Sequence, residues 1–169
     1  IMVEWEGVKI GNANNRGGRR PCRPGYTVVI GRHSVDGLAR IDAGPDFTGR
    51  GGMHVRGRSS SGFPKKQYAW ETWTNEDEDK DVSILGMTSE SDWILHAPYS
   101  DKTLLRNMLV YESARDLYGD GGGMRARFVE LFMNVDGGTV SMSDYRGVYV
   151  VMEKIKRDGD RVDVEKLCD

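Results

Sequence analysis

The chain has 169 residues, with 24 Lys and Arg against 26 Asp and Glu, and so a net charge of −2. This near balance gives no overall attraction to nucleic acid or to an anionic membrane surface. No apolar run approaches the roughly 20 residues that span a bilayer, and no signal-peptide pattern opens the sequence. The length suffices for one domain with its own core, and the 22 glycines predict many tight turns, as in a sheet-rich fold.

Both ends of the sequence indicate a part of a larger protein. The chain opens on Ile1 instead of an initiator Met, and it stops at Asp169 inside a charged segment. The two cysteines, Cys22 and Cys168, cannot form a four-cysteine zinc site, and sequence alone does not predict a disulfide between them. Two unpaired thiols are the favoured interpretation.

The first part of the chain predicts few regular elements. Residues 1–10 contain a short apolar run that fits an edge strand, and residues 11–25 are rich in turn formers, which predicts a loop. Residues 26–30 (YTVVI) are mostly β-branched and bounded by glycines, which predicts a strand. We expect a further short strand at residues 37–41 and a loop at residues 43–52.

The most distinctive stretch is residues 53–68, MHVRGRSSSGFPKKQY. It predicts a strand from residue 53, a turn rich in Gly, Ser and Arg, and a second strand over residues 63–73 that carries two lysines. On that second strand Lys66 shares a face with Tyr68 and Trp70, because successive strand residues point to opposite faces of a sheet.

The clearest predicted helix covers residues 101–117. Ser100 is the expected N-cap, and Asp101 in the first turn suits the helix dipole. Five apolar residues at helical spacing predict the stripe that packs on the sheet. They are Leu104, Leu105, Met108, Leu109 and Tyr111. At about 100° per residue Glu112 falls inside this stripe, where its carboxylate needs a partner because an unpaired buried charge is costly.

Three further strands complete the expected fold. Residues 92–96 (DWILH) predict a short one, and residues 126–133 and 147–155 have the near-continuous apolar content of central strands covered on both sides. We therefore predict an α+β fold, an antiparallel sheet with one main packed helix. The main domain is expected over residues 26–169, after an N-terminal extension over residues 1–25.

The turn at residues 57–62, with Arg56 and Arg58, has the composition of a phosphate-binding loop. Backbone N–H groups, hydroxyls and guanidinium groups are the donors that phosphate oxygens accept from. It is not a Walker A loop, because no G-x-x-x-x-G-K-[ST] occurs. The plainer alternative is a hairpin turn whose arginines lie in solvent.

Lys65 and Lys66 follow this turn closely enough to reach a phosphate bound there. One of them could pair with Glu112, which is how protein kinases hold a strand lysine at the phosphates of the nucleotide. The alternative is one lysine in solvent and one whose stem lies along apolar surface. Spacing does not decide which lysine faces inward, although the face shared with Tyr68 and Trp70 slightly favours Lys66.

The remaining candidate groups give weaker signals. His33, His54 and His96 lack a metal-binding spacing and are interpreted as structural. A hydrolase is disfavoured because no G-x-S-x-G elbow occurs. The aromatic residues are interpreted mostly as core, and Tyr99, at the helix entrance, is the first candidate to stack on a nucleobase.

Four ordered blocks of the sequence resemble the CotH family, the spore-coat-protein-H-like atypical kinases. The blocks are RGRSSSGFPKKQY (56–68), LGMTSESDWILHAPYSDKTLLRN (85–107), RFVELFMN (127–134) and YRGVYVVMEKIKRDGDRVDV (145–164). The resemblance covers roughly residues 26–167. It implies a two-lobed, protein-kinase-like fold that binds ATP with magnesium and phosphorylates Ser or Thr of secreted or spore-coat proteins. It also implies a location outside the cell or on the cell or spore surface.

Carried over residue by residue, the resemblance implies a nucleotide site. Its nucleotide-facing loop would contain Arg56, Gly57, Arg58, Ser59 and Ser60. Lys65 or Lys66 resembles the strand lysine, and Glu112 resembles its helix partner. Arg58 departs from the commoner family form, which has Asn there, so the local charge of the loop differs.

Further site residues follow from the later blocks. Arg106 and Asn107 match the R-N signature of the family. The strand that leads into the hinge between lobes would bring three residues near the adenine edge: Met152, Glu153 and Lys154.

The magnesium-binding and catalytic aspartates of the family belong to a second lobe, which we expect beyond residue 169. The chain is therefore predicted to be the small lobe, which alone would not transfer a phosphoryl group. Two alternatives stay open. One is a non-catalytic surface or spore-coat domain for adhesion or assembly, and the other is transfer of a different group on the same fold.

Overall fold

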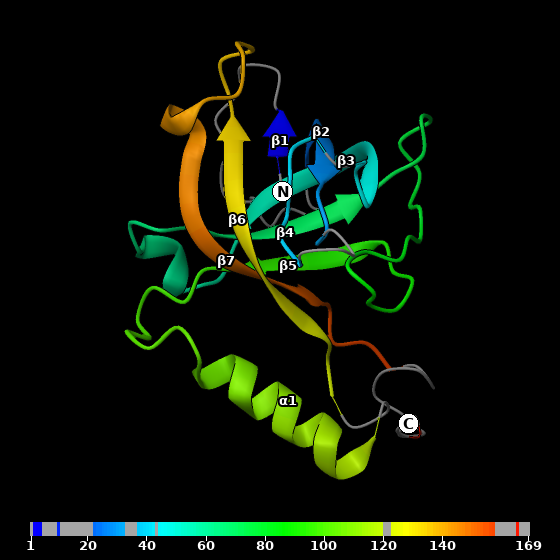
Figure 1. The fold of residues 1–169 in the computed structure, drawn as a ribbon, viewed down its shortest axis with the longest axis vertical. Helices are drawn as coiled ribbons and strands as arrows, with labels where there is room; N and C mark the ends of the chain where they lie inside the picture. The colour runs from blue at the N-terminus through cyan, green and yellow to red at the C-terminus, as the bar shows by residue number, and fades with distance from the viewer. Residues whose placement is uncertain are drawn as a thin grey trace.

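The computed structural model describes residues 2–4, 10, 22–32, 37–42, 44–119, 123–157 and 165. In this part of the chain a sheet curls into a barrel, and one helix lies across its lower end (Figure 1). The strands are β1 (Met2–Glu4), β2 (Arg23–Val29), β3 (Phe47–Arg56), β4 (Gln67–Thr72), β5 (Asp92–His96), β6 (Ala126–Asn134) and β7 (Tyr145–Glu153). The helix is α1 (Arg106–Tyr118), and two 3-10 turns are η1 (Ser60–Gly62) and η3 (Met142–Asp144).

The strand order is β1-β2-β3-β4-β5-β7-β6, and β1 closes the barrel by pairing with both β2 and β6. All pairs are antiparallel except β1 with β6, which is parallel. The predicted α+β fold with an antiparallel sheet and one main helix is confirmed. The expectation of an edge strand near the N-terminus is wrong, because β1 has a partner on each side.

The barrel interior is an aromatic and aliphatic core. On β4 the alternation predicted from the sequence holds, since Tyr68, Trp70 and Thr72 are buried while their neighbours are half-buried. Trp70 and Trp93 lie with ring centroids 6.1 Å apart, and each buries about 150–250 Å² of surface. This core fixes the register of β4 and β5, because a slip by one residue would turn both indoles outward.

Strand β3 begins at Phe47, so the prediction of a loop over residues 43–52 is wrong for its second half. Glycines made that segment look like a loop, but they serve close packing between β3 and β4. A Cβ on Gly52 would lie 2.1 Å from the Trp73 ring, and one on Gly51 would lie 2.3 Å from the Glu71 carbonyl oxygen. The strand therefore tolerates no side chain at these positions.

Other boundaries also differ from the predictions. Strand β2 starts at Arg23, earlier than expected, and residues 37–41 contribute a single bridge, between Arg32 and Ala39. Residues 149–153 of β7 are buried throughout, as expected for a central strand, whereas Phe128 on β6 is 42% exposed. The predictions about His33 and Cys168 fall outside the described residues.

Helix α1 begins at Arg106, five residues later than predicted, and Ser100 is not its N-cap. The Asp101 carboxylate instead accepts N–H bonds from Thr103 at 3.0 Å and Arg106 at 3.0 Å, which holds the chain in a turn before the helix. The helix ends at Tyr118, one residue beyond the predicted end, and the Gly119 N–H donates to the Arg115 carbonyl.

The predicted apolar stripe is only partly correct. Met108 and Tyr111 pack on an outer cluster formed by Ile94, Met124, Ala126, Val150 and Met152. Leu105 and Leu109 are 47% and 62% exposed, and no residue of α1 is buried. The helix thus rests on the sheet by one narrow edge. None of the helices in the described ranges is long and apolar enough to span a bilayer.

Candidate functional site

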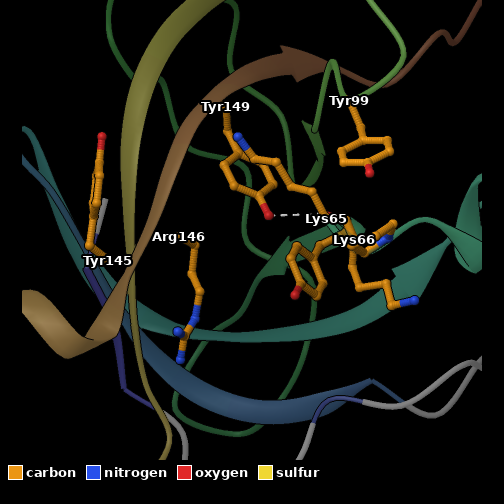
Figure 2. A pocket seen from close by; sticks show the side chains of 8 residues that line it. Lys65, Lys66, Tyr99, Tyr145, Arg146 and Tyr149 are labelled. Atoms are coloured by element: carbon orange, nitrogen blue, oxygen red, sulfur yellow. Dashed lines mark hydrogen bonds between the residues drawn. The ribbon is translucent and has the colours of Figure 1, made fainter.

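A pocket of about 430 Å³ opens where the start of β7 faces the segment before β4. Its lining contains three cations, four tyrosines and a proline, and we call it the cationic pocket. The lining residues are Pro64, Lys65, Lys66, Tyr68, Tyr99, Tyr145, Arg146 and Tyr149. No carboxylate belongs to this lining, although the whole chain carries more acidic than basic residues. The pocket is therefore a local concentration of positive charge between aromatic walls (Figure 2).

Lys65 lies against the aromatic wall. Its Nζ donates to the Val148 carbonyl oxygen at 2.5 Å and lies 4.6 Å from the centroid of the Tyr149 ring, a cation–π contact. Burial lowers the pKa of Lys65. Gly147 makes room for this side chain, because its φ is +88° and a Cβ there would lie 3.2 Å from Nζ. The ammonium group is held at the pocket wall by backbone and ring together.

Lys66 connects the pocket to the preceding turn. Its Nζ donates to the Ser61 carbonyl oxygen at 2.8 Å, and its own carbonyl accepts the Tyr149 hydroxyl at 3.0 Å. Burial raises the pKa of Tyr149 well above its usual range, so the hydroxyl keeps its proton and remains a donor. Both lysines precede β4, which begins at Gln67, so the predicted strand over residues 63–73 starts too early. The face shared with Tyr68 is therefore no longer a reason to prefer Lys66 over Lys65.

Arg146 is the third cation, and the sequence analysis did not single it out. Its guanidinium group donates to the carbonyl oxygens of Met133 and Ser143, both at 3.3 Å. Its charge opposes the rise that burial causes in the pKa of Tyr68. The strand order β4-β5-β7 brings Arg146 to the same pocket as the lysines. In this order Tyr68 on β4 pairs with Leu95 on β5, and Leu95 pairs with Val151 on β7.

The serine-rich turn (residues 56–62) lies beside the pocket and does not line it. The Ser61 hydroxyl donates to the Arg58 carbonyl at 2.7 Å, and the Gly62 N–H donates to the Ser59 carbonyl at 3.1 Å. These donors are used within the turn. Of the five loop residues assigned to nucleotide binding, Gly57, Arg58 and Ser59 are exposed, and Arg56 and Ser60 are half-buried.

Tyr99, the candidate for stacking on a base, lines the pocket. It is 40% exposed, and its ring packs on Phe63 with centroids 5.2 Å apart. Lys102 lies over the same ring, 5.6 Å from its centroid. Phe63 ends η1, so this contact joins the serine-rich turn to the pocket wall.

The family model described as CotH kinase protein matches residues 53–167. The chain belongs to this family. The match includes the serine-rich turn, the whole cationic pocket and α1. It begins at Met53, so it leaves out the first strands that the sequence resemblance also covered. A search of the curated proteins found no match.

The R-N signature of the CotH resemblance lies at the start of α1. The Asn107 amide contacts His96 Nε2 at 3.2 Å, and His96 Nδ1 contacts the Gln67 amide oxygen at 3.0 Å. Burial and the charge of Arg56 lower the pKa of His96. Arg106 is largely exposed and pairs with Asp101 at 3.7 Å. These residues fasten α1 to the sheet, and they do not line the pocket.

Glu112 does not pair with either lysine in the structure. Its carboxylate is 46% exposed and lies 3.8 Å from Arg115 and 4.0 Å from Arg127. The expectation of a buried Glu112 is therefore wrong, because α1 starts later and contacts the sheet only through a narrow edge. The cation that approaches it from the sheet is Arg127 on β6.

The three residues assigned to the adenine edge lie at the other end of β7 from Arg146. Met152 is buried in the outer cluster under α1, and Lys154 is exposed and pairs with Asp92 at 3.2 Å. Glu153 is fully buried and lies four residues beyond Tyr149, which is about 13 Å along the strand. The structure thus separates these residues from the pocket that holds the lysines.

Magnesium is the other group that a kinase family implies. The described part of the chain contains no group of three or more His, Cys, Asp or Glu side chains that could hold a metal ion. The donors of the cationic pocket are ammonium, guanidinium and phenol groups, which fit phosphate oxygens and do not fit a divalent cation.

Proposed function

We propose that this chain is the nucleotide-binding small lobe of an ATP-dependent kinase that phosphorylates Ser or Thr side chains of secreted or coat proteins. The observation that supports it is the cationic pocket, which brings Lys65, Lys66 and Arg146 together without a carboxylate in the lining. Membership of the CotH kinase family makes a nucleotide the natural anionic ligand for this pocket. The same resemblance supports a location outside the cell or on a cell or spore surface.

In this proposal the two lysines bind and orient phosphate oxygens. Each ammonium group carries three N–H donors, and among the described residues each donates one hydrogen bond to a carbonyl. The remaining donors are available to a ligand. Tyr99 offers a partly exposed ring at the rim for contact with the base. The bond between Lys66 and Ser61 holds the serine-rich turn beside the phosphate end of the ligand.

ATP supplies the γ-phosphoryl group that is transferred. The proposal assigns the magnesium ligands and the catalytic base to a second lobe, because the donors of the pocket fit phosphate only. Glu112 can act as the partner of a lysine only if it leaves Arg127 and Arg115. Both contacts are long, at 4.0 and 3.8 Å, and lie near solvent, so such an exchange costs little.

The test is calorimetric titration of the intact protein with ATP and Mg²⁺. Lys65→Ala and Lys66→Ala should each weaken binding by roughly 10-fold or more, because each removes a charge-assisted hydrogen bond. Lys80→Ala is the matched control, since Lys80 is exposed near the opposite end of β4 and its backbone carbonyl accepts the Thr72 hydroxyl. If Glu112→Ala binds ATP as the wild type does, only the assignment of Glu112 to the site is refuted.

Failure of the wild-type protein to bind ATP would overturn the kinase proposal. The non-catalytic alternative, a surface or coat domain for adhesion or assembly, would then account for the fold. Binding of ATP without transfer to any protein acceptor would separate nucleotide binding from kinase activity.

A further inference from the structure

Arg146 lines the cationic pocket from the start of β7, and in Figure 2 its guanidinium group points away from the ammonium groups of Lys65 and Lys66. The guanidinium group has five N–H donors in a planar fork. Within the described ranges its two hydrogen bonds, to Met133 and Ser143, are both 3.3 Å long, beyond the usual range of about 2.7–3.2 Å. Arg146 is also exposed. It can therefore turn toward a ligand without giving up a strong contact.

We propose that Arg146, Lys65 and Lys66 together bind the terminal phosphates of a polyphosphate chain. The cationic pocket then takes the phosphate end of the nucleotide, and the base lies toward the rim. This inference rests on the proposed function for its nucleotide, but the anion site itself stands on the pocket geometry.

The charge balance of the pocket favours a multiply charged ligand. Three like charges share one lining that contains no carboxylate, so an anion that enters the pocket meets cations and no opposing negative charge from the lining. The hydroxyls of Tyr145 and Tyr149 already donate to Glu130 and to the Lys66 carbonyl, so their rings form walls and the cations supply the donors. A guanidinium fork binds two phosphate oxygens at once, which two ammonium groups on flexible stems cannot do with the same geometry.

The position of the base follows from the same geometry. Tyr99 is the exposed ring of the lining, and its neighbour Phe63 is half-buried and lies beside the pocket. The interior wall is instead the Tyr149 ring, whose face is occupied by Lys65. Tyr99 therefore offers a base the most exposed ring of the lining, whereas phosphate oxygens meet cations inside the pocket.

The experiment measures dissociation constants of three probes on the intact protein at fixed ionic strength: inorganic tripolyphosphate, ATP and adenosine. Tripolyphosphate and ATP should bind competitively, and adenosine should bind far more weakly than either. Arg146→Gln should weaken tripolyphosphate and ATP by the same factor, roughly 10- to 100-fold. Arg50→Gln is the control, because Arg50 lies outside the lining and pairs with Asp77 at 2.5 Å.

The possible outcomes separate this inference from the proposed function. If Arg146→Gln binds both phosphate probes as the wild type does, while Lys65→Ala and Lys66→Ala weaken ATP, the role of Arg146 is refuted and the kinase proposal stands. If tripolyphosphate binds through Arg146 and ATP does not, the anion site stands and the nucleotide proposal fails. If neither probe binds, both fail.

A second variant guards against loss of folding. Arg146→Lys keeps the charge and loses the fork, so its affinity for tripolyphosphate should lie between those of the wild type and Arg146→Gln. Circular dichroism melts show whether each variant is folded. A folded Arg146→Lys with wild-type affinity would refute bidentate binding by the guanidinium group.

Discussion

Replacing Glu153 by Gln tests whether this residue stabilises the sheet or contacts a nucleotide. The side chain is fully buried at the end of β7. Its carboxylate accepts the Thr88 N–H at 2.8 Å and the Arg125 N–H at 3.1 Å, and the Arg125 guanidinium lies 3.6 Å away. We expect Glu153→Gln to lower the stability of the protein and to leave its affinity for ATP unchanged.

The magnitude follows from the groups that lose a partner. A glutamine amide has one oxygen, so one of the two buried N–H groups is left without an acceptor, at about 1–3 kcal/mol. Arg125 also loses the counter-charge beside it, and breaking a buried pair by removing one member costs about 3–5 kcal/mol. The two costs overlap, because both arise from the same lost carboxylate oxygen, so we expect a total of about 3–5 kcal/mol. For a domain of this size that lowers the Tm by about 6–20 °C.

Differential scanning calorimetry of the intact protein measures the stability, and titration with ATP measures the site. Lys154→Gln is the matched control, because Lys154 is the next residue and its ion pair with Asp92 lies at the surface. Such pairs contribute at most about 1 kcal/mol. A Glu153→Gln variant that melts like the wild type but binds ATP more weakly would refute the structural role and restore the adenine-edge assignment.

Three further predictions concern the pocket, the helix start and the helix face. Gly147→Ala should lower the stability by about 1–3 kcal/mol, because φ is +88° at this position and a Cβ there would crowd the pocket. The control is Gly137→Ala, whose φ is +74° in open space; it should lower the stability less and leave the affinity for tripolyphosphate unchanged. Equal effects of the two variants would contradict this prediction. The folded protein holds the pKa of His96 below 6.5. The unfolded chain therefore binds more protons, and the stability should fall as the pH drops below about 6.5. Urea unfolding at about pH 8 and pH 5 should show this loss of stability in the wild type and a smaller loss in His96→Gln. Met108→Ala should destabilise the protein by about 1–2 kcal/mol and Leu109→Ala by less than about 0.5 kcal/mol, because of these two residues only Met108 packs on the sheet. If chemical denaturation shows a larger loss for Leu109→Ala than for Met108→Ala, the apolar stripe packs as first predicted.

The strands that carry period-two or continuous apolar patterns could be predicted from the sequence. Strands β4 to β7 fall within a few residues of their expected positions, because their patterns reflect the faces that they bury. The end of strand β3, from Met53, was predicted, but its start at residues 47–52 could not be, since the glycines there are required by the Trp73 ring and the Glu71 carbonyl. A local pattern contains no information about such a contact, and glycine clusters therefore read as loops.

The candidate site was only partly predictable for a similar reason. The composition of the serine-rich turn pointed to Lys65 and Lys66, and the structure brings both to one pocket with Tyr99. Arg146 and Tyr149 join them from 83 residues or so away along the chain, as the bond between Lys65 and Val148 shows. That proximity depends on strand order and register, which no spacing in the sequence encodes.

A comparison of Glu112 with Glu153 shows which sequence pattern better predicts a buried carboxylate. Helical spacing predicted a buried Glu112. Because α1 contacts the sheet by one edge only, most of its apolar stripe lies near solvent, and Glu112 lies there too. Glu153 instead ends a run of strand residues that are all buried, and so it had no exposed side to turn to. Its donors, Thr88 and the backbone and guanidinium of Arg125, come from distant segments and converge on it. An acidic residue at the end of a continuous apolar strand is therefore a stronger indication of a buried, hydrogen-bonded carboxylate than one on a predicted helical stripe, because a strand between two neighbours cannot rotate the charge into solvent.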